Sequence, residues 1–257
     1  MLVISVRTKR RCFLEEVTAT LEALDEEGVL PEHLTLIRKN GSVRRRIADL
    51  IKSGGYQPTT SQKLAREIMG KNFFGVEEAV QHLGVKPTKA QLSALVEVLY
   101  TEAELREVKS THVLVAVFPL SILDIRGKLK RELFYRHEDA WYNNQEFAKD
   151  KGEVGWYPVR KTSVPNSTSK TWSEQQALLA QNEETPKAQE MVCTIIGHFL
   201  ATGERLFENV WVRCSDLASD GDHVCVGDFV RGGLSVRNWW RDNRHGDLGL
   251  ASSRKFQ

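Results

Sequence analysis

The side chains with the most varied chemistry lie near the end of the chain, between Val224 and Phe256. They offer thiol, carboxylate, guanidinium, hydroxyl, amide, indole and imidazole groups without the spacing of a metal site or a nucleophilic centre. Arg and Trp are the residues that most often dominate binding hot spots between proteins. The pattern therefore favours non-covalent binding of a macromolecule. The candidate ligand-binding residues are Cys225, Asp228, Arg231, Ser235, Arg237, Asn238, Trp239, Arg241, Asn243, His245, Gly246 and Asp247.

A regular frame of apolar residues and glycines separates these candidates and is typical of short strands and tight turns. The frame comprises Val224, Val226, Gly227, Phe229, Gly233, Leu234, Val236, Trp240, Leu248 and Gly249. Successive residues of a strand face opposite sides. Residues Val224, Val226, Leu234 and Val236 are therefore expected to face the interior. Cys225, Ser235 and Arg237 are expected to face a ligand. Of the adjacent tryptophans, Trp240 is assigned to the core and Trp239 to the binding face.

A restriction in the genetic code links most of the candidates. Apart from Trp239, each candidate residue is encoded by a codon that arises from an Asn codon when the adenines at its first two positions are kept or changed. Lys, Glu, Gln and Met, which such changes do not produce, are absent from Val224 to Ser253. Together with the frame GL.V..WW.D.R...LGLASSRKF, this pattern resembles the variable region of target proteins of diversity-generating retroelements. In that family, adenine-directed mutagenesis rewrites a ligand-binding face.

The resemblance also carries an expectation about the fold. The segment ATGERLFENVWVRCSDLASDGDHVCVGDF looks like the same family, whose variable proteins share a C-type lectin-like fold with formylglycine-generating-type proteins. It implies an α+β, C-type lectin-like domain at 108–257 with its variable region at about 224–256. The family resemblance implies no catalytic residue, no metal and no cofactor. The expected partner is a macromolecular ligand, a protein rather than a nucleic acid or a membrane.

The elements that must position these residues follow from hydrophobic patterning. The run HVLVAVFPLSIL predicts a buried strand at Val113–Phe118, and a second strand is predicted at Val210–Arg213. Helices are predicted near 172–179 and 187–201, the second closed by Gly203. Two helices among short strands and long connections indicate an α+β class for residues 108–257.

Residues 1–107 are predicted to be mainly helical. Apolar periodicity predicts helices at Phe13–Leu24 and Ser42–Lys52, and a third that Thr60 or Ser61 would cap. The stretch 76–99 has the outline of a helix-turn-helix hairpin. This outline supports an alternative function, a transcriptional regulator with a C-terminal ligand-sensing domain. Lys89 is the only basic residue within 89–99, which argues against DNA reading by this hairpin.

Composition narrows the class of protein without naming its function. A hydrophobic content of 41% with a net charge of +2 describes an ordinary globular chain with no marked preference for a polyanion. The start MLVISVRTKRRCFLEE places its charges after the apolar residues, the wrong order for a secretory signal, so a cytoplasmic location is expected. The four cysteines lie far apart, which argues against a zinc site.

Three further clusters are interpreted as structural rather than catalytic. The acids from Asp216 to Asp222 are read as a hairpin turn, because calcium needs six to eight oxygen ligands. His137, Glu138 and Asp139 lack the HExxH pattern of a zinc protease. A formylglycine-generating activity would need paired active-site cysteines, and Cys225 occupies a candidate variable position. No enzyme activity is therefore expected.

Overall fold

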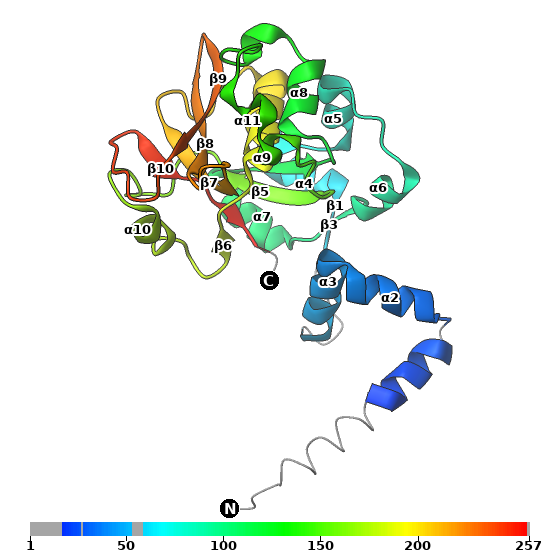
Figure 1. The fold of residues 1–257 in the computed structure, drawn as a ribbon. Helices are drawn as coiled ribbons and strands as arrows, with labels where there is room; N and C mark the ends of the chain where they lie inside the picture. Colours follow the sequence, from blue (N-terminus) through cyan, green and yellow to red (C-terminus); the bar gives the residue numbers. More distant parts are fainter. Residues whose placement is uncertain (1–16, 27, 53–58, 256–257) are drawn as a thin grey trace, which may run out of the picture. The chain divides into compact units, whose positions relative to one another are not determined.

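The computed structural model describes residues 17–26, 28–52 and 59–255, and the chain divides into two compact units, Met1–Gln57 and Pro58–Gln257. Figure 1 shows the fold. The sequence predicts a boundary after residue 107, whereas the structure places it after Gln57. The difference arises because β2 (Phe73–Phe74) pairs in parallel with β4 (His112–Val117). Residues 60–108 are thus built into the same unit as the C-terminal half.

The first unit consists of helices in its described part. They span 17–26, α2 (Pro31–Lys39) and α3 (Gly41–Lys52). The predicted helix at Ser42–Lys52 is confirmed by α3. Residues 17–24 of the helix predicted from Phe13 are helical, while residues 13–16 lie outside the described residues.

The second unit mixes helices and strands, as expected for an α+β chain. Its helices are α4 (Gln62–Met69), η1 (Gly70–Asn72), α5 (Val76–Leu83), α6 (Lys89–Ala94), α7 (Glu102–Val108), α8 (Ile122–Lys128), η2 (Arg131–Leu133), η3 (Trp141–Asn144), α9 (Glu146–Lys149), α10 (Trp172–Gln176) and α11 (Ala188–Thr202). Its further strands are β1 (Thr60–Ser61), β3 (Glu97–Val98), β5 (Gly155–Arg160), β6 (Glu183–Glu184), β7 (Trp211–Leu217), β8 (His223–Val230), β9 (Gly233–Trp239), β10 (Leu248–Leu250) and β11 (Ser253–Arg254).

These strands form three sheets. A five-stranded sheet has the order β2-β4-β5-β11-β6, a four-stranded sheet the order β10-β7-β8-β9, and β1 pairs with β3. The predicted strands at Val113–Phe118 and Val210–Arg213 correspond to β4 and β7, and the predicted helices near 172–179 and 187–201 correspond to α10 and α11. Residues 248–254 contribute β10 to the four-stranded sheet and β11 to the five-stranded sheet.

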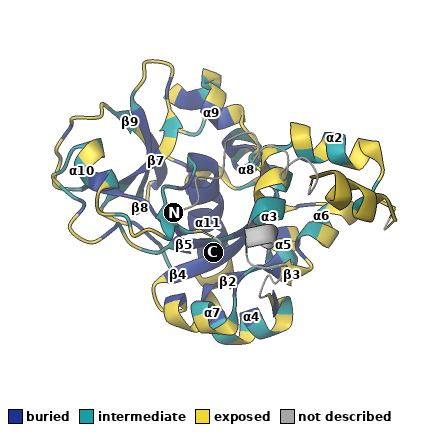
Figure 2. Cartoon of the chain, turned by 90° about the horizontal axis from the view of Figure 1, so that it is seen from below, coloured by how far each residue is buried: buried dark blue, intermediate teal, exposed yellow. Residues whose placement is uncertain are grey.

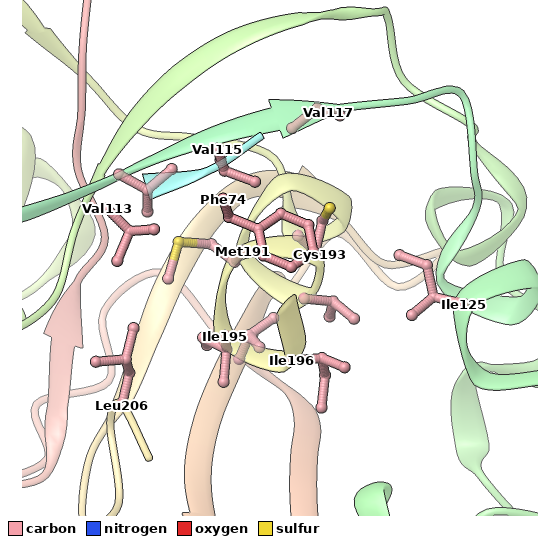
Figure 3. Close-up of a cluster of buried hydrophobic side chains, with 14 of the residues drawn as sticks. Phe74, Val113, Val115, Val117, Ile125, Met191, Cys193, Ile195, Ile196 and Leu206 are labelled. Carbon is pink, nitrogen blue, oxygen red and sulfur yellow. The ribbon is translucent and has the colours of Figure 1, made fainter. Parts of the chain in front are cut away.

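Helix α11 is the centre of the core. Its first eleven residues, 188–198, are all buried, as a helix with apolar residues on every side requires. It contacts strands of both large sheets. Figure 3 shows Met191, Ile195 and Ile196 of this helix among side chains from β2, β4 and α8. In Figure 2, α11 and β4 are coloured as buried.

The stretch 76–99 does not form two comparable helices. Helix α5 buries Ala79 and Leu83 and contacts α11, so it belongs to the core. The predicted second helix, Lys89–Leu99, ends already at Ala94, and residues 97–98 form a strand that pairs with β1. The remaining helix α6 has six residues and buries none of them. The helix-turn-helix interpretation is therefore not supported by the geometry.

A buried carboxyl in α11 gives a prediction on pH dependence. Burial raises the pKa of Glu190 from 4.5 to about 7, although its carboxylate accepts the Lys187 N–H at 2.9 Å. Because the unfolded chain ionises Glu190 at lower pH than the folded chain, stability should fall as pH rises from 4.5 to 7. The loss is about 3 kcal/mol. Urea unfolding at pH 4 and pH 8 should show Glu190→Gln gaining about that much relative to wild type at the higher pH.

The comparison of variant with wild type removes the titration of other groups. Burial lowers the pKa values of His112 and His223 to about 4, so these histidines favour the folded state less as pH falls below 6.5. Both proteins share that trend, and the glutamine side chain of the Glu190→Gln variant would still accept the Lys187 N–H. A stability difference that stays constant between pH 4 and pH 8 would contradict the prediction.

Candidate ligand-binding face

Strands β7, β8 and β9 place three rows of residues on one face, which we call the outer face. Residues directly opposite each other in antiparallel strands share a face. The first row pairs Trp211, Gly227 and Ser235, the second Arg213, Cys225 and Arg237, and the third Leu217, His223 and Trp239. This register places the candidate Cys225 of β8 directly beside the candidate Arg237 of β9.

The opposite face of the same strands confirms the predicted frame. Val224, Val226, Leu234 and Val236 are all buried, at 5% exposure or less. Val212 and Cys214 of β7 are buried with them. Among all the frame residues, Trp240 is the one that lies outside the buried class. The alternation of the sequence thus fixes which side of the sheet packs on the core.

Two candidates on the outer face are buried, contrary to expectation. Cys225 is fully buried and Ser235 is 3% exposed. The guanidinium of Arg237 lies over the indole ring of Trp211, 5.4 Å from its centroid, and its Nε donates to the Ser235 hydroxyl at 3.4 Å. Ser235 therefore lies beneath the side chain of Arg237. Arg237 itself is exposed, as predicted.

Asn238 lies on the other side of the strand from Arg237. It is opposite Val224, a core-facing residue, at the end of β9. Its amide donates to the Asp220 carboxylate at 2.8 Å, so it contacts the turn at 218–222 instead of the outer face. Asn238 and Arg237 therefore do not share a face of the sheet, because adjacent strand residues point in opposite directions.

Residues 240–247, here called the variable loop, are held by main-chain hydrogen bonds. The N–H groups of Trp172, Ser169 and Trp211 donate to the carbonyls of Arg241, His245 and Asp247, at 2.7, 2.9 and 2.8 Å. Within the loop the Asn243 N–H donates to the Trp240 carbonyl at 3.0 Å. Every residue type supplies the carbonyl that these bonds need. The path of the loop therefore depends little on its side chains.

The side chains of the variable loop mostly point to solvent. Arg241, His245 and Gly246 are exposed, while Asn243 is buried at 8% exposure. His245 hydrogen-bonds to the half-buried Asp247, and its ring lies 5.6 Å from that of Trp239. The exposed Arg244 forms a salt bridge with Glu174 at 2.9 Å.

The two adjacent tryptophans have the reverse of their predicted roles. Trp240, assigned to the core, is 57% exposed, whereas Trp239 is half-buried with its indole N–H enclosed. The strand ends at Trp239, opposite His223, so the alternation of faces does not extend to Trp240. Trp240 thus joins the exposed candidates, and Trp239 belongs to the layer beneath them.

A buried arginine connects this loop to the rest of the unit. Arg213 is fully buried, and its Nη2 donates to the carbonyls of Trp240 at 3.1 Å and Asn243 at 2.8 Å. Its Nη1 donates to the Lys170 carbonyl at 3.1 Å and the Gln175 side-chain oxygen at 2.8 Å. Burial lowers its pKa, and no carboxylate pairs with it among the described residues. Arg213 was not predicted as a site residue.

Two of the remaining candidates, Asp228 and Arg231, lie towards the β8–β9 turn. Asp228 is half-buried with a φ of 49°, and its N–H donates to the Val210 carbonyl at 3.0 Å. Asp247 is bonded through its carbonyl to the neighbouring Trp211. Arg231 is exposed in the turn between β8 and β9, at the opposite end of β9 from Trp239. Arg231 is therefore separated from the cluster around Arg237.

The acidic and histidine clusters singled out in the sequence do not form a metal or catalytic site in the described part of the chain. Asp216 accepts the Ala188 N–H at 2.6 Å at the start of α11, whereas Asp220 is engaged with Asn238. Glu138 pairs with Arg131. No group of three or more His, Cys, Asp or Glu side chains able to hold a metal occurs among the described residues. Burial raises the pKa of each described thiol, that of Cys193 to about 12, which disfavours the nucleophilic thiolate.

Comparison with known proteins adds no relative. Neither family models, nor curated proteins, nor solved structures match this chain. In the ranges 17–26, 28–52 and 59–255, no helix has the length and apolar character that a membrane crossing requires.

The exposure of Trp240 leads to a stability prediction. Trp240→Ala should change the free energy of unfolding by no more than about 0.5 kcal/mol, because the ring is largely in solvent. Trp156→Ala is the matched comparison, since Trp156 is 2% exposed and donates to the Leu95 carbonyl at 3.2 Å. It should cost about 3–5 kcal/mol. Urea unfolding of both variants tests this, and equal losses would show that Trp240 packs into the core.

Proposed function

We propose that this chain is a ligand-binding protein whose C-terminal segment is rewritten by a diversity-generating retroelement. Residues 108–257 would form a C-type lectin-like domain that displays the rewritten positions. The ligand is the surface of another protein, bound without covalent chemistry or a cofactor. The mixed sheets around α11 agree with this domain class at the level of an α+β fold. The finer assignment depends on the sequence pattern.

The main-chain anchoring of the variable loop is the observation that carries the proposal. Residues that change in size and charge must not disturb the fold, since unfavourable core changes cost about 1 kcal/mol or more. Bonds through the carbonyls of Arg241, His245 and Asp247 are available whichever side chain is present. A loop held in this way can exchange its outward side chains while its path is kept.

The burial of frame and candidate residues supports the same separation. All frame residues except Trp240 are buried, whereas most candidates are exposed or half-buried. The buried candidates are Cys225, Ser235 and Asn243, of which the first two are small. We therefore place Asn243 and Trp239 in the supporting layer. The positions best placed to vary are Arg237, Arg241 and His245, and Trp240 joins them as an exposed contact.

The exposed side chains suit a protein surface. Trp240 offers apolar area, and Arg237 and Arg241 offer planar groups with several hydrogen-bond donors. Neither arginine has an ion pair among the described residues, so both charges are available to a ligand. A combination of aromatic area and hydrogen-bonding groups is also what antibody loops use. Half-buried Trp211 supports Arg237 from below.

Sequencing this gene in many cells of one lineage tests the proposal. We expect substitutions between codons 225 and 247, at adenine-derived positions, with Arg237, Arg241 and His245 among the most frequently changed. Codons 108–223 in the same reads are the control and should show only background substitutions. Frame codons such as those of Val226 and Leu234 should also remain unchanged. Substitutions spread evenly over both segments, or no substitutions above background in either segment, would refute diversification of this gene.

A further inference from the structure

The helices of the N-terminal unit repeat one pattern of apolar residues. In each helix these residues are spaced by four and then three positions. The sets are Val17, Leu21 and Leu24 in the first helix, the N-cap residue Leu30 with Leu34 and Ile37 of α2, and Val43, Ile47 and Leu50 in the sequence of α3. Residues at this spacing lie on one face of an α-helix. Each helix therefore has a single apolar stripe.

No stripe residue whose side chain the structure describes is buried. Val17, Leu21 and Leu30 are 38%, 43% and 46% exposed, and no residue of α2 is buried. Leu36 of α2, which lies outside this stripe, is 55% exposed as well. Figure 2 shows α2 coloured mainly as exposed or intermediate, in contrast to α11. A helical unit of this size is close to the limit for forming a stable core from its own residues.

The charges of the same helices are complementary to each other. The helix at 17–26 contains Glu22, Asp25 and Glu26 and no Lys or Arg. Helix α3 contains Arg44, Arg45 and Arg46, with Asp49 as its single acid. Each chain therefore carries one acidic and one basic helix. In a two-fold arrangement the acidic helix of one chain faces the basic helix of the other, and the contact occurs twice.

We propose that residues 17–52 pair with the same residues of a second copy, so that the N-terminal unit makes the protein a dimer. The pairing covers the apolar stripes and joins the opposite charges. The dimer itself does not depend on the proposed function. If the outer face binds a ligand, two such faces in one particle raise the effective concentration at a repetitive target, which strengthens weak single contacts.

Charge-swap variants of the full chain test this pairing. One variant carries Glu22→Lys and Glu26→Lys, and the other carries Arg44→Glu and Arg45→Glu. Light scattering of the wild type should give twice the chain mass of 29.2 kDa. Each variant alone should approach the mass of one chain, because both helices then have the same sign of charge. An equimolar mixture of the two variants should regain the doubled mass.

Controls separate loss of pairing from unfolding of the second unit, and recovery of the doubled mass in the mixture shows that the first unit of both variants still folds. All six tryptophans lie between residues 141 and 240, so near-ultraviolet circular dichroism reports on the second unit and should be unchanged in both variants. Val96→Glu, at a position 63% exposed in the second unit, should leave the mass doubled. A wild-type mass of one chain would overturn the proposal. So would variants that remain dimeric alone, or a mixture that fails to regain the doubled mass.

Discussion

Replacing Gly227 with alanine should lower the free energy of unfolding by about 3–5 kcal/mol. Gly227 lies in β8 opposite Trp211 with a φ of 150°, which side chains rarely adopt. A Cβ atom there would lie 2.1 Å from the Val210 carbonyl oxygen and 2.9 Å from the Trp211 Cα. Both are main-chain atoms, so no side chain can move aside. Strands β7 and β8 would have to separate at the point where the Asp228 N–H donates to that carbonyl.

Gly246 is the matched control for this variant. It lies in the variable loop, and a Cβ atom there would meet no atom within 4 Å. Gly246→Ala should shift the free energy of unfolding by no more than about 0.5 kcal/mol. Urea denaturation followed by tryptophan fluorescence measures both variants. Equal effects would mean that frame and candidate glycines are not structurally distinct.

Replacing Arg213 with methionine should also cost about 3–5 kcal/mol. The variant leaves the carbonyls of Lys170, Trp240 and Asn243 without their buried donor. A buried charge can sometimes be replaced by an apolar residue at no cost, but only when its partners are replaced too. Here the partners are main-chain carbonyls and the Gln175 amide, which remain. We therefore expect destabilisation.

Arg237→Met provides the comparison for Arg213→Met. Both arginines are in the same row of the sheet, on either side of Cys225. Arg237 is exposed and lies on the ring of Trp211, so its replacement should cost less than about 1 kcal/mol. The same urea experiment compares the two. If the exposed arginine proved as costly to replace as the buried one, the assignment of Arg213 as the anchor of the loop would fail.

The sequence correctly predicts which residues face the core where a strand is long enough for apolar and polar residues to alternate. Val224 and Val226 of β8, and Leu234 and Val236 of β9, face the core as expected, because one register error would expose all of them. Helix α11 was also recognisable, since its apolar run is long and ends at Gly203 with a φ of 75°. These features depend on local sequence and on a single strong burial signal.

The errors occur where position depends on contacts between distant segments. Trp240 follows the last residue of β9, so its exposure is set by the loop bonded to Trp172 and Ser169. Arg213 lies between the core-facing residues Val212 and Cys214, so the strand pattern predicts an exposed arginine. In the structure it is buried, because Gln175 and the loop cover it. Strand β2 has two residues, too few for any period, yet its pairing with β4 joins 60–108 to the second unit.

Strands β10 and β11 follow the variable loop in the sequence, so their formation depends on correct translation through the loop. Residues 248–250 complete the four-stranded sheet beside β7, and Ser253 lies between β5 and β6 in the five-stranded sheet. Arg254 forms a salt bridge with Glu107, and its carbonyl accepts the Tyr100 hydroxyl. A copying event that shifts the reading frame or ends translation within the loop would remove a strand from both sheets. Under the proposed diversification, only genes that keep the reading frame through the loop encode both strands. Variants that lose the frame would therefore fail to fold and would not display a binding face.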